Sequence, residues 1–322
     1  MRPRHHGHLR RRPADRDRPG AGLCRGCRQP RARGRPGGLV RASALPAAPP
    51  PIPAATRFDL GSGRPVVFLH GWATHGGFFR LQEPLAGPDR RLIALDLPGH
   101  GAARAEGRPV VFADLAPAVS TWLDDAGLDG IVLVGWSMGA SVAFDLIARF
   151  GPARIAGLVV IDMTARILDA PGWTHGLAGG LTPAQVERAS AAMRANWPRQ
   201  AERVVERLFA PGRRTDTPDL AGFVEAIAAA DGAAMASLWS TLAVTDFRSA
   251  LPRIDRPALV VSGAESRLYR PDVGPALAQA LPRGRHVAID GTGHAPQIEA
   301  PAAFNRVLAE FIASLSDQEQ QP

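Results

Sequence analysis

The sequence contains no lysine and only two cysteines among its 322 residues. All 38 basic side chains are therefore arginine, which we attribute to codon usage and not to a mechanism. Both cysteines, Cys24 and Cys27, lie near the N-terminus, so the rest of the chain gives no indication of a redox compartment, and a cytoplasmic location is the default expectation. No apolar run is long enough to span a membrane, and Arg10–Arg12 lacks the apolar core of a secretion signal. We therefore expect no membrane association.

Residues 1–55 have the composition of a disordered tail. They hold thirteen arginines against Asp15 and Asp17, together with many glycines and prolines and few apolar side chains. Such a segment cannot bury enough surface to offset the entropy of ordering, so we predict either disorder or an over-extended translation start. The remaining residues carry slightly more acidic than basic side chains, which places the net charge of +8 in the tail.

The tail also carries two weaker signals. Residues 24–27 read Cys-Arg-Gly-Cys, a single pair that His5, His6 and His8 could complete as a zinc site, but no second cysteine pair follows. The arginines could contact nucleic acid non-specifically, although no folded nucleic-acid-binding module accompanies them. We therefore expect neither a metal nor a nucleic-acid partner in the main function.

The most informative motif follows a buried strand. Residues 131–134 are apolar and mostly β-branched, and the chain then reads Gly-Trp-Ser-Met-Gly over 135–139 before a helical run that stops at Gly151. Strand, sharp turn and helix form the context in which G-x-S-x-G is a nucleophile elbow, with Ser137 exposed at the top of the sheet. The two glycines fit this interpretation because a Cβ at either position would collide with the neighbouring strand or helix. The alternative is an ordinary glycine-rich turn.

An exposed serine is a weak nucleophile unless a base and an oxyanion site accompany it. His294 stands in a glycine-rich loop after the strand over 286–289, from which it can reach the serine, so we take it as the base. The backbone N–H of Met138, directly after the serine, and that of Trp72, in the loop after the strand over 65–69, are the predicted oxyanion hole.

The acidic partner of His294 is ambiguous. Its usual place is the loop after the strand over 258–261, but the third residue after Gly263 is Ser266, which cannot stabilise an imidazolium as a carboxylate does. Asp162 ends the strand over 155–161 and could approach the histidine from there, whereas Glu265 stands one position early in the usual loop. We favour Asp162 as the acid and keep Glu265 as the alternative. A capping or loop-bracing carboxylate is the other interpretation of Asp162.

Short apolar strands alternate with helical stretches along residues 56–165 and again along 251–316. This alternation is typical of a mostly parallel sheet with helices on both faces, so we predict an α/β fold made of these two segments. Residues 166–250 show helical patterns only and are predicted to form a lid inserted above the strand ends. Residues 317–322 are expected to be a disordered end.

We expect the substrate pocket to lie under this lid. The predicted lining combines the loop after 65–69, the residue before the serine and the lid tryptophans: His70, Gly71, Trp72, Trp136, Trp173, Trp197 and Trp239. The alternative for the lid aromatic residues is that they form the lid's own core.

Four motifs occur in a fixed order along the chain: His-Gly-Trp over 70–72, Asp-Leu-Pro-Gly-His-Gly over 96–101, the serine motif, and Gly-His-Ala-Pro over 293–296. Over roughly residues 56–315 the chain thereby resembles the α/β-hydrolase superfamily, and more narrowly the pimeloyl-ACP methyl ester esterases of biotin synthesis. The resemblance implies an α/β-hydrolase fold with Ser137 as nucleophile and His294 as base. It also implies an aspartate at position 266, where this chain has serine. An acid at Asp162 is similar to some haloalkane dehalogenases, whose aspartate nucleophile Ser137 excludes.

The expected reaction is acyl transfer to water through an acyl-enzyme on Ser137, with no cofactor. The predicted activity is that of a carboxylic ester hydrolase acting on a small or acyl-chain ester. A lactonase, a thioesterase and a cofactor-free perhydrolase fit the same motif. A non-hydrolytic ligand receptor is the alternative of another class.

The resemblance further implies an acidic acyl carrier protein as partner, bound by arginines of the lid. The candidates are Arg188, Arg194, Arg199, Arg203 and Arg207. A basic lid could steer an acidic partner toward the site. The alternative is a solvated helix face with intrahelical ion pairs, such as Glu202 with Arg207. The sequence leaves the oligomeric state open.

Overall fold

The computed structural model describes residues 51–214 and 218–319 of the chain. The cysteine pair over 24–27 with its histidines, and residues 1–50 of the predicted tail, lie outside the described residues. The first strand begins at Ala55, one residue before the predicted start of the folded body.

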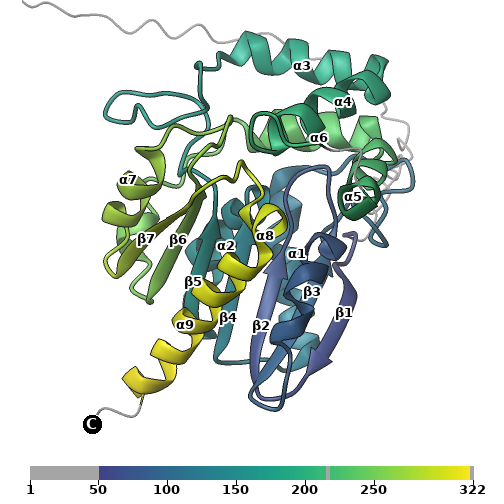
Figure 1. Cartoon of the computed structure of the whole chain (residues 1–322). Coiled ribbons are helices and arrows are strands. Elements are labelled where there is room, and N and C mark those ends of the chain that lie inside the picture. The colour runs from purple at the N-terminus through teal and green to yellow at the C-terminus, as the bar shows by residue number, and fades with distance from the viewer. Residues whose placement is uncertain (1–50, 215–217, 320–322) are drawn as a thin grey trace, which may run out of the picture. The chain divides into compact units, whose positions relative to one another are not determined.

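A seven-stranded sheet forms the centre of the fold (Figure 1). Its strand order is β1-β3-β2-β4-β5-β6-β7, and every neighbouring pair is parallel except β1 with β3, which is antiparallel. The predicted α/β fold with a mostly parallel sheet is thereby confirmed. The strands are β1 Ala55–Gly61, β2 Arg64–Leu69, β3 Arg90–Asp96, β4 Ile131–Trp136, β5 Ile155–Ile161, β6 Ala258–Gly263 and β7 Gly284–Ile289.

Helices cover both faces of the sheet, which explains why its central strands are apolar along their whole length (Figure 1). Helices α1 (Leu115–Ala126) and α2 (Met138–Phe150) lie on one face, and α9 (Pro301–Glu319) crosses the other. The shorter elements are α7 Val273–Ala280, α8 Pro296–Glu299 and the 3₁₀ helices η1 Gly76–Leu85, η2 Phe112–Asp114 and η3 Leu251–Arg253.

Helix α9 extends further than the sequence analysis predicts. It continues to Glu319, so the first three residues of the expected disordered end, 317–322, are helical. The physical reason is that no glycine or proline interrupts the chain between Leu315 and Glu319.

Between β5 and β6 the chain leaves the sheet and builds a helical layer above the carboxyl ends of the strands (Figure 1). Its helices are α3 Pro183–Ala195, α4 Trp197–Leu208, α5 Pro218–Ala228 and α6 Gly232–Leu242. The two stems of this insertion meet in an antiparallel bridge between Arg166 and Asp246, whose side chains approach to 2.6 Å. Among the described helices, no single one has the length and hydropathy of a membrane span. Helices α5 and α6 have that length and hydropathy only when taken together, and the pair is bent by 89°.

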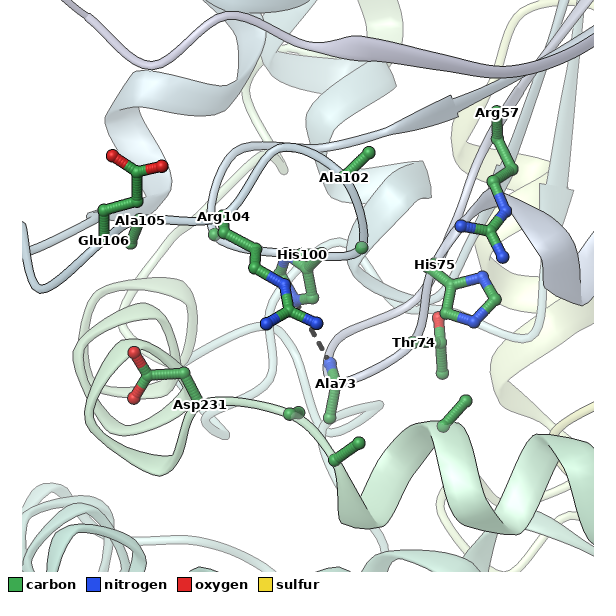
Figure 2. Close-up of a pocket in the computed structure, with 15 residues that line it drawn as sticks. Arg57, Ala73, Thr74, His75, His100, Ala102, Arg104, Ala105, Glu106 and Asp231 are labelled. Carbon is green, nitrogen blue, oxygen red and sulfur yellow. Dashed lines mark hydrogen bonds between the residues drawn. The ribbon is translucent and has the colours of Figure 1, made fainter.

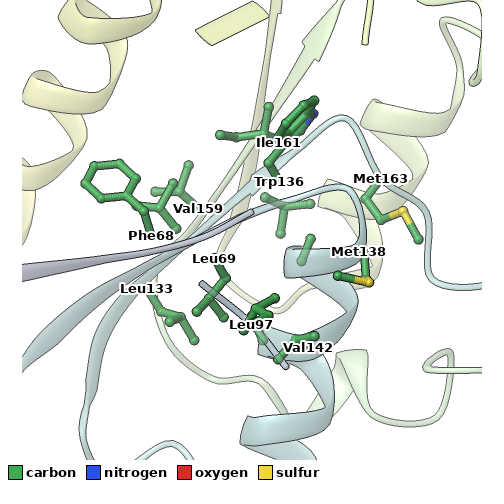
Figure 3. Close-up of a cluster of buried hydrophobic side chains, with 14 of the residues drawn as sticks. Phe68, Leu69, Leu97, Leu133, Trp136, Met138, Val142, Val159, Ile161 and Met163 are labelled. Carbon is green, nitrogen blue, oxygen red and sulfur yellow. The ribbon is translucent and has the colours of Figure 1, made fainter. Parts of the chain in front are cut away.

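The core packs tightly behind the turn between β4 and α2 (Figure 3). Phe68, Leu133 and Val159, from three neighbouring strands, are completely buried. Trp136, the last residue of β4, is also buried, and its indole N–H donates to the carbonyl oxygen of His294 at 2.7 Å. This hydrogen bond ties the central strand to the loop that carries the predicted base.

Two glycines make the turn between β4 and α2 possible. A Cβ on Gly139 would lie 2.0 Å from the carbonyl oxygen of Leu69, and one on Gly135 would lie 2.5 Å from the Cα of Ala140. Both obstacles are backbone atoms, which cannot rotate away. The start of α2 can therefore approach the end of β2 only when residue 139 has no side chain.

We predict that Gly139→Ala destabilises the protein by about 3 kcal/mol or more, because the added methyl group meets backbone. Gly87→Ala is the matched control, since a Cβ there would have nothing within 4 Å, and it should change the free energy of unfolding by less than about 0.5 kcal/mol. Urea unfolding monitored by circular dichroism measures both. Equal midpoints for the two variants would contradict the prediction.

Candidate active site

Ser137 lies on the sharp turn that joins β4 to α2. Its backbone has φ 52° and ψ −119°, a conformation that a non-glycine residue adopts only when its surroundings hold it. The surroundings do so: the Ser137 N–H donates to the carbonyl oxygen of Ile161 at 2.9 Å, and the Ser137 carbonyl oxygen accepts from Ala140 at 2.9 Å. The serine side chain is partly exposed and lines a cavity under the lid.

His294 follows β7 in a loop that is bound to the lid. Its backbone N–H donates to the carbonyl oxygen of Leu208, at the end of α4, at 2.9 Å. The imidazole is buried, and its Nδ1 lies 2.6 Å from Oδ2 of Asp162. We assign the proton to Nδ1, because a carboxylate can only accept, which leaves Nε2 as the free acceptor. His294 and Ser137 line the same cavity.

Asp162 directly follows β5 and is buried beside the imidazole. Its backbone has φ 41°, and its N–H donates to the carbonyl oxygen of Val261 on β6 at 2.8 Å. Oδ2 accepts a second hydrogen bond, at 2.7 Å, from the hydroxyl of Ser266. Glu265, the alternative acid, is exposed and does not line the cavity. Of the two candidates, the structure therefore brings Asp162 and not Glu265 to His294.

The predicted oxyanion donors, the backbone N–H groups of Met138 and Trp72, come from α2 and from the loop after β2. Met138 is the first residue of α2, where a backbone N–H has no acceptor within its own helix and carries part of the positive end of the helix dipole. Trp72 follows β2, and its indole N–H donates to the carbonyl oxygen of Met235 on α6 at 3.0 Å. The loop after β2 is thereby fastened to the lid.

Two buried histidines hold the loop after β2 and are not part of the cavity. His70 donates from Nδ1 to the carbonyl oxygen of Gly71 at 2.7 Å and accepts the N–H of Leu97 at Nε2 at 2.9 Å. His100 accepts the N–H of Ala73. Burial lowers the pKa of each imidazole to about 3, so both are neutral at physiological pH. His70 was predicted to line the pocket; it lies beneath the loop because both of its nitrogens bond to backbone.

The cavity shared by Ser137 and His294 has a volume of about 730 Å³. Gly71, Trp72, Trp136 and Trp239 line it as predicted, together with apolar residues that the sequence analysis did not identify: Met163, Ile167, Leu177, Leu181, Met193, Leu242 and Leu268.

Two predicted lining tryptophans lie elsewhere. Trp173 packs edge-on against His175, with ring centroids 5.2 Å apart, in the loop before α3. Trp197 is inside the lid, where its indole N–H donates to Ile227 at 3.1 Å and its ring contacts Trp72. Each ring packs against another aromatic side chain, and neither lines the cavity.

The exposed lining of the cavity carries more basic than acidic side chains, with three arginines against Glu206. The arginines are Arg203 and Arg207 of α4 and Arg267 of the loop after β6. Arg267 donates to the carbonyl oxygen of Glu206 at 2.9 Å. The other predicted lid arginines, Arg188, Arg194 and Arg199, are exposed and lie outside the cavity lining.

A second, larger cavity of about 840 Å³ is lined by the loop over 73–75 and by Arg57, His100 and Arg104 (Figure 2). It reaches neither the serine nor the predicted base. Its described lining includes no serine or cysteine, and its buried His100 is neutral and bonds to backbone. The candidate site is therefore the smaller cavity, which both Ser137 and His294 line. Within the described residues, no group of three His, Cys, Asp or Glu side chains is arranged to hold a metal ion.

Sequence reasoning missed a buried carboxylate that joins the predicted base to the lid. Glu299 accepts the N–H of Gly293 at 2.7 Å with one oxygen and the N–H of Ala210 at 2.8 Å with the other. Burial raises the pKa of Glu299, while these backbone donors act in the opposite direction. The glutamate five residues after His294 was visible in the sequence, but its partner at the end of α4 was not.

The family profile described as alpha/beta hydrolase fold matches residues 64–301. The chain belongs to this α/β-hydrolase family. Its curated relatives include the pimeloyl-[acyl-carrier protein] methyl ester esterase of Xanthomonas oryzae, 31% identical over 258 residues that cover 80% of this chain and 98% of the relative. The esterase of the same name from Stenotrophomonas maltophilia is 28% identical over 259 residues, with 80% and 95% covered. The resemblance found in the sequence motifs is confirmed.

Solved structures agree on the fold. A thermophilic esterase from Thermogutta terrifontis matches with a TM-score of 0.72 at 26% identity, over 81% of this chain and 93% of that chain. An enol-lactonase from Burkholderia xenovorans matches with a TM-score of 0.71 at 23% identity, over 81% and 96%, and at that identity it shows the fold alone.

The buried neutral histidines predict a pH dependence of stability. His100 has an ordinary pKa of 6.5 when unfolded and about 3 when folded, so the unfolded chain binds its proton first as the pH falls. Stability is therefore fully present above pH 6.5 and is lost below it, by about 1.4 kcal/mol per pH unit for one proton. His100→Gln keeps an acceptor for Ala73 but cannot titrate. Its free energy of unfolding, from urea titrations between pH 7 and 5, should fall less steeply than that of the unmodified protein; parallel curves would contradict this.

Proposed function

We propose that this α/β hydrolase is a serine carboxylic ester hydrolase in which Ser137 is the nucleophile, His294 the base and Asp162 the acid. One observation carries the proposal: His294 Nδ1 lies 2.6 Å from Asp162 Oδ2, while the same imidazole lines one cavity with Ser137. An imidazole held in this way keeps its proton on Nδ1 and presents an unprotonated Nε2, as a general base requires. The names of the curated relatives as esterases support the same activity.

The reaction consists of two successive acyl transfers. His294 Nε2 takes the proton of Ser137 as Oγ attacks the ester carbonyl carbon, and the N–H groups of Met138 and Trp72 hold the negative oxygen. The bond to the alcohol breaks as His294 returns the proton to the leaving oxygen. Water then attacks the acyl-enzyme with His294 again as base, which releases the carboxylic acid and restores Ser137. Asp162 stays ionised throughout and stabilises the imidazolium.

The cavity favours an ester with an extended apolar part. Its walls are mostly apolar, and its exposed lining includes Arg203, Arg207 and Arg267. An acyl chain would fill the apolar interior, while an anionic carrier at its far end would meet the arginines. This arrangement fits a methyl ester presented by an acyl carrier protein, the substrate for which the curated relatives are named, and supports a place in biotin synthesis.

We predict that the protein hydrolyses p-nitrophenyl esters, with a preference for acyl chains longer than acetate. Ser137→Ala should abolish turnover. Asp162→Asn should lower kcat by about 10³-fold or more. An amide does not fix the imidazole proton on Nδ1 as a carboxylate does, and it cannot stabilise the imidazolium. Release of p-nitrophenolate from the acetate-to-decanoate series measures each variant and shows the chain length that the cavity accepts.

The matched control is Glu265→Gln, which removes a carboxylate from the same neighbourhood and should leave kcat within about twofold. Loss of activity in Glu265→Gln but not in Asp162→Asn would show that Glu265, and not Asp162, is the acid. Faster turnover of lactones, thioesters or peracids would assign the corresponding alternative reaction. A folded protein that neither hydrolyses esters nor is labelled at Ser137 by a fluorophosphonate would instead be a ligand receptor.

We further predict that an acyl carrier protein binds at the arginines of α4. The double variant Arg203→Gln/Arg207→Gln should lower kcat/KM on a carrier-linked methyl ester by about tenfold at low salt, and the difference should shrink in 0.5 M NaCl because salt screens exposed charges. Arg253→Gln/Arg306→Gln is the control, an equal change of charge at two exposed arginines that do not line the cavity. A kcat/KM that does not depend on salt in the unmodified protein would contradict the prediction.

A further inference from the structure

Ser266 stands next to the candidate acid and outside the substrate cavity. It lies in the loop after β6, and its hydroxyl donates to Oδ2 of Asp162 at 2.7 Å. The same oxygen accepts Nδ1–H of His294 at 2.6 Å. Two donors from different loops therefore meet on one carboxylate oxygen, and the serine touches neither the nucleophile nor the cavity.

The hydroxyl of Ser266 is oriented by its own loop. Its oxygen lies 3.4 Å from the backbone nitrogens of Leu268 and Tyr269, whose N–H groups donate to it. With its lone pairs occupied by these donors, the hydroxyl hydrogen is left to point at Asp162. The bond to the carboxylate is thus built into the loop, and no ordering of a flexible side chain is needed to form it.

The other polar side chains near Asp162 are hydrogen-bonded to other partners and not to its carboxylate. The hydroxyl of Tyr269 donates to the sulfur of Met163 at 3.0 Å, and Nε2 of His286 is bonded to Ser262 at 2.8 Å. Within the described residues, the side-chain donors that reach the Asp162 carboxylate are therefore His294 and Ser266. A buried carboxylate needs hydrogen-bond donors to stay ionised and in one rotamer, and the imidazole alone supplies one.

We infer that Ser266 is a positioning residue for the catalytic acid. It fixes the carboxylate of Asp162 so that Oδ2 stays on Nδ1 of His294, which in turn keeps Nε2 directed at Ser137. It also withdraws charge from the shared oxygen, which weakens the attraction of that oxygen for an imidazolium. The inference rests on the proposed function, in which Asp162 is the acid.

The same geometry gives residue 266 access to the imidazole. Its Oγ lies 2.7 Å from the atom that contacts Nδ1, so a carboxylate carried by residue 266 would reach the position now occupied by Oδ2 of Asp162. Residues 162 and 266 are 104 positions apart in the chain, yet a hydrogen bond joins their side chains at the oxygen that contacts Nδ1 of His294.

The test is Ser266→Ala. Without the hydroxyl, kcat on the best p-nitrophenyl ester should fall by about tenfold with KM little changed, because the loss affects the base and not substrate binding. The acid limb of kcat/KM should move to higher pH, since a carboxylate that has lost a hydrogen-bond donor attracts the imidazolium more strongly. Ser266→Thr keeps the hydroxyl and should restore both quantities. A purely structural role would lower the amount of folded protein without moving the pH profile.

Two further measurements separate this inference from the proposed function. In proton NMR, the downfield Nδ1–H signal of His294 should exchange with water faster in Ser266→Ala than in the unmodified protein, whether or not an ester is turned over. The exchanged pair Asp162→Ser/Ser266→Asp should be at least about tenfold more active than Asp162→Ser alone. An unmodified protein without esterase activity would refute the proposed function. An unchanged NMR signal and pH profile in Ser266→Ala, or a threonine variant that behaves like alanine, would overturn the role of Ser266.

Discussion

The turn between β4 and α2 exists only because residues 135 and 139 carry no side chain. A Cβ at 139 would meet the carbonyl oxygen of Leu69, so α2 can begin against the end of β2 only with glycine there. This close approach brings three features to one point: the left-handed backbone of Ser137, the free N–H groups of the first turn of α2, and the loop that follows β2. The exposure of the serine and the position of the candidate oxyanion donors both follow from a single steric constraint.

Buried polar side chains hold the loops around that turn, and each of them is hydrogen-bonded to backbone groups. Asp96 accepts the N–H groups of Gly76 and Ala102, at 2.8 and 2.7 Å, and the two neutral histidines bond to backbone on either side of it. Such groups would be costly to bury unpaired, so each hydrogen bond fixes one backbone segment. The histidines that hold the loop of Trp72 are therefore neutral at physiological pH.

Local patterns were sufficient to predict the fold class and to nominate Ser137 and His294 as candidates, because each lies in a motif whose meaning depends on its immediate neighbours. Asp162 required a comparison of two strand ends, and its contact with His294 depends on strand order, which no local pattern encodes. The predicted pocket lining does not hold for His70, Trp173 and Trp197, because an aromatic side chain can face a cavity or a neighbouring segment with the same sequence pattern. The hydrogen bonds of Ser266 and Glu299 join residues that are distant in the chain. A single sequence does not show which distant residues will meet.

The bridge made by Glu299 has a consequence for protein engineering. Its carboxylate joins the end of α4 to the loop of His294, and the Leu208 carbonyl adds a second connection. Although residues 208–210 belong to the inserted segment by sequence, their hydrogen bonds support the loop of His294. A chimaera that exchanges the lid for that of a relative must therefore place its junction before Leu208, because a junction beyond it would replace the support of the imidazole along with the walls of the pocket.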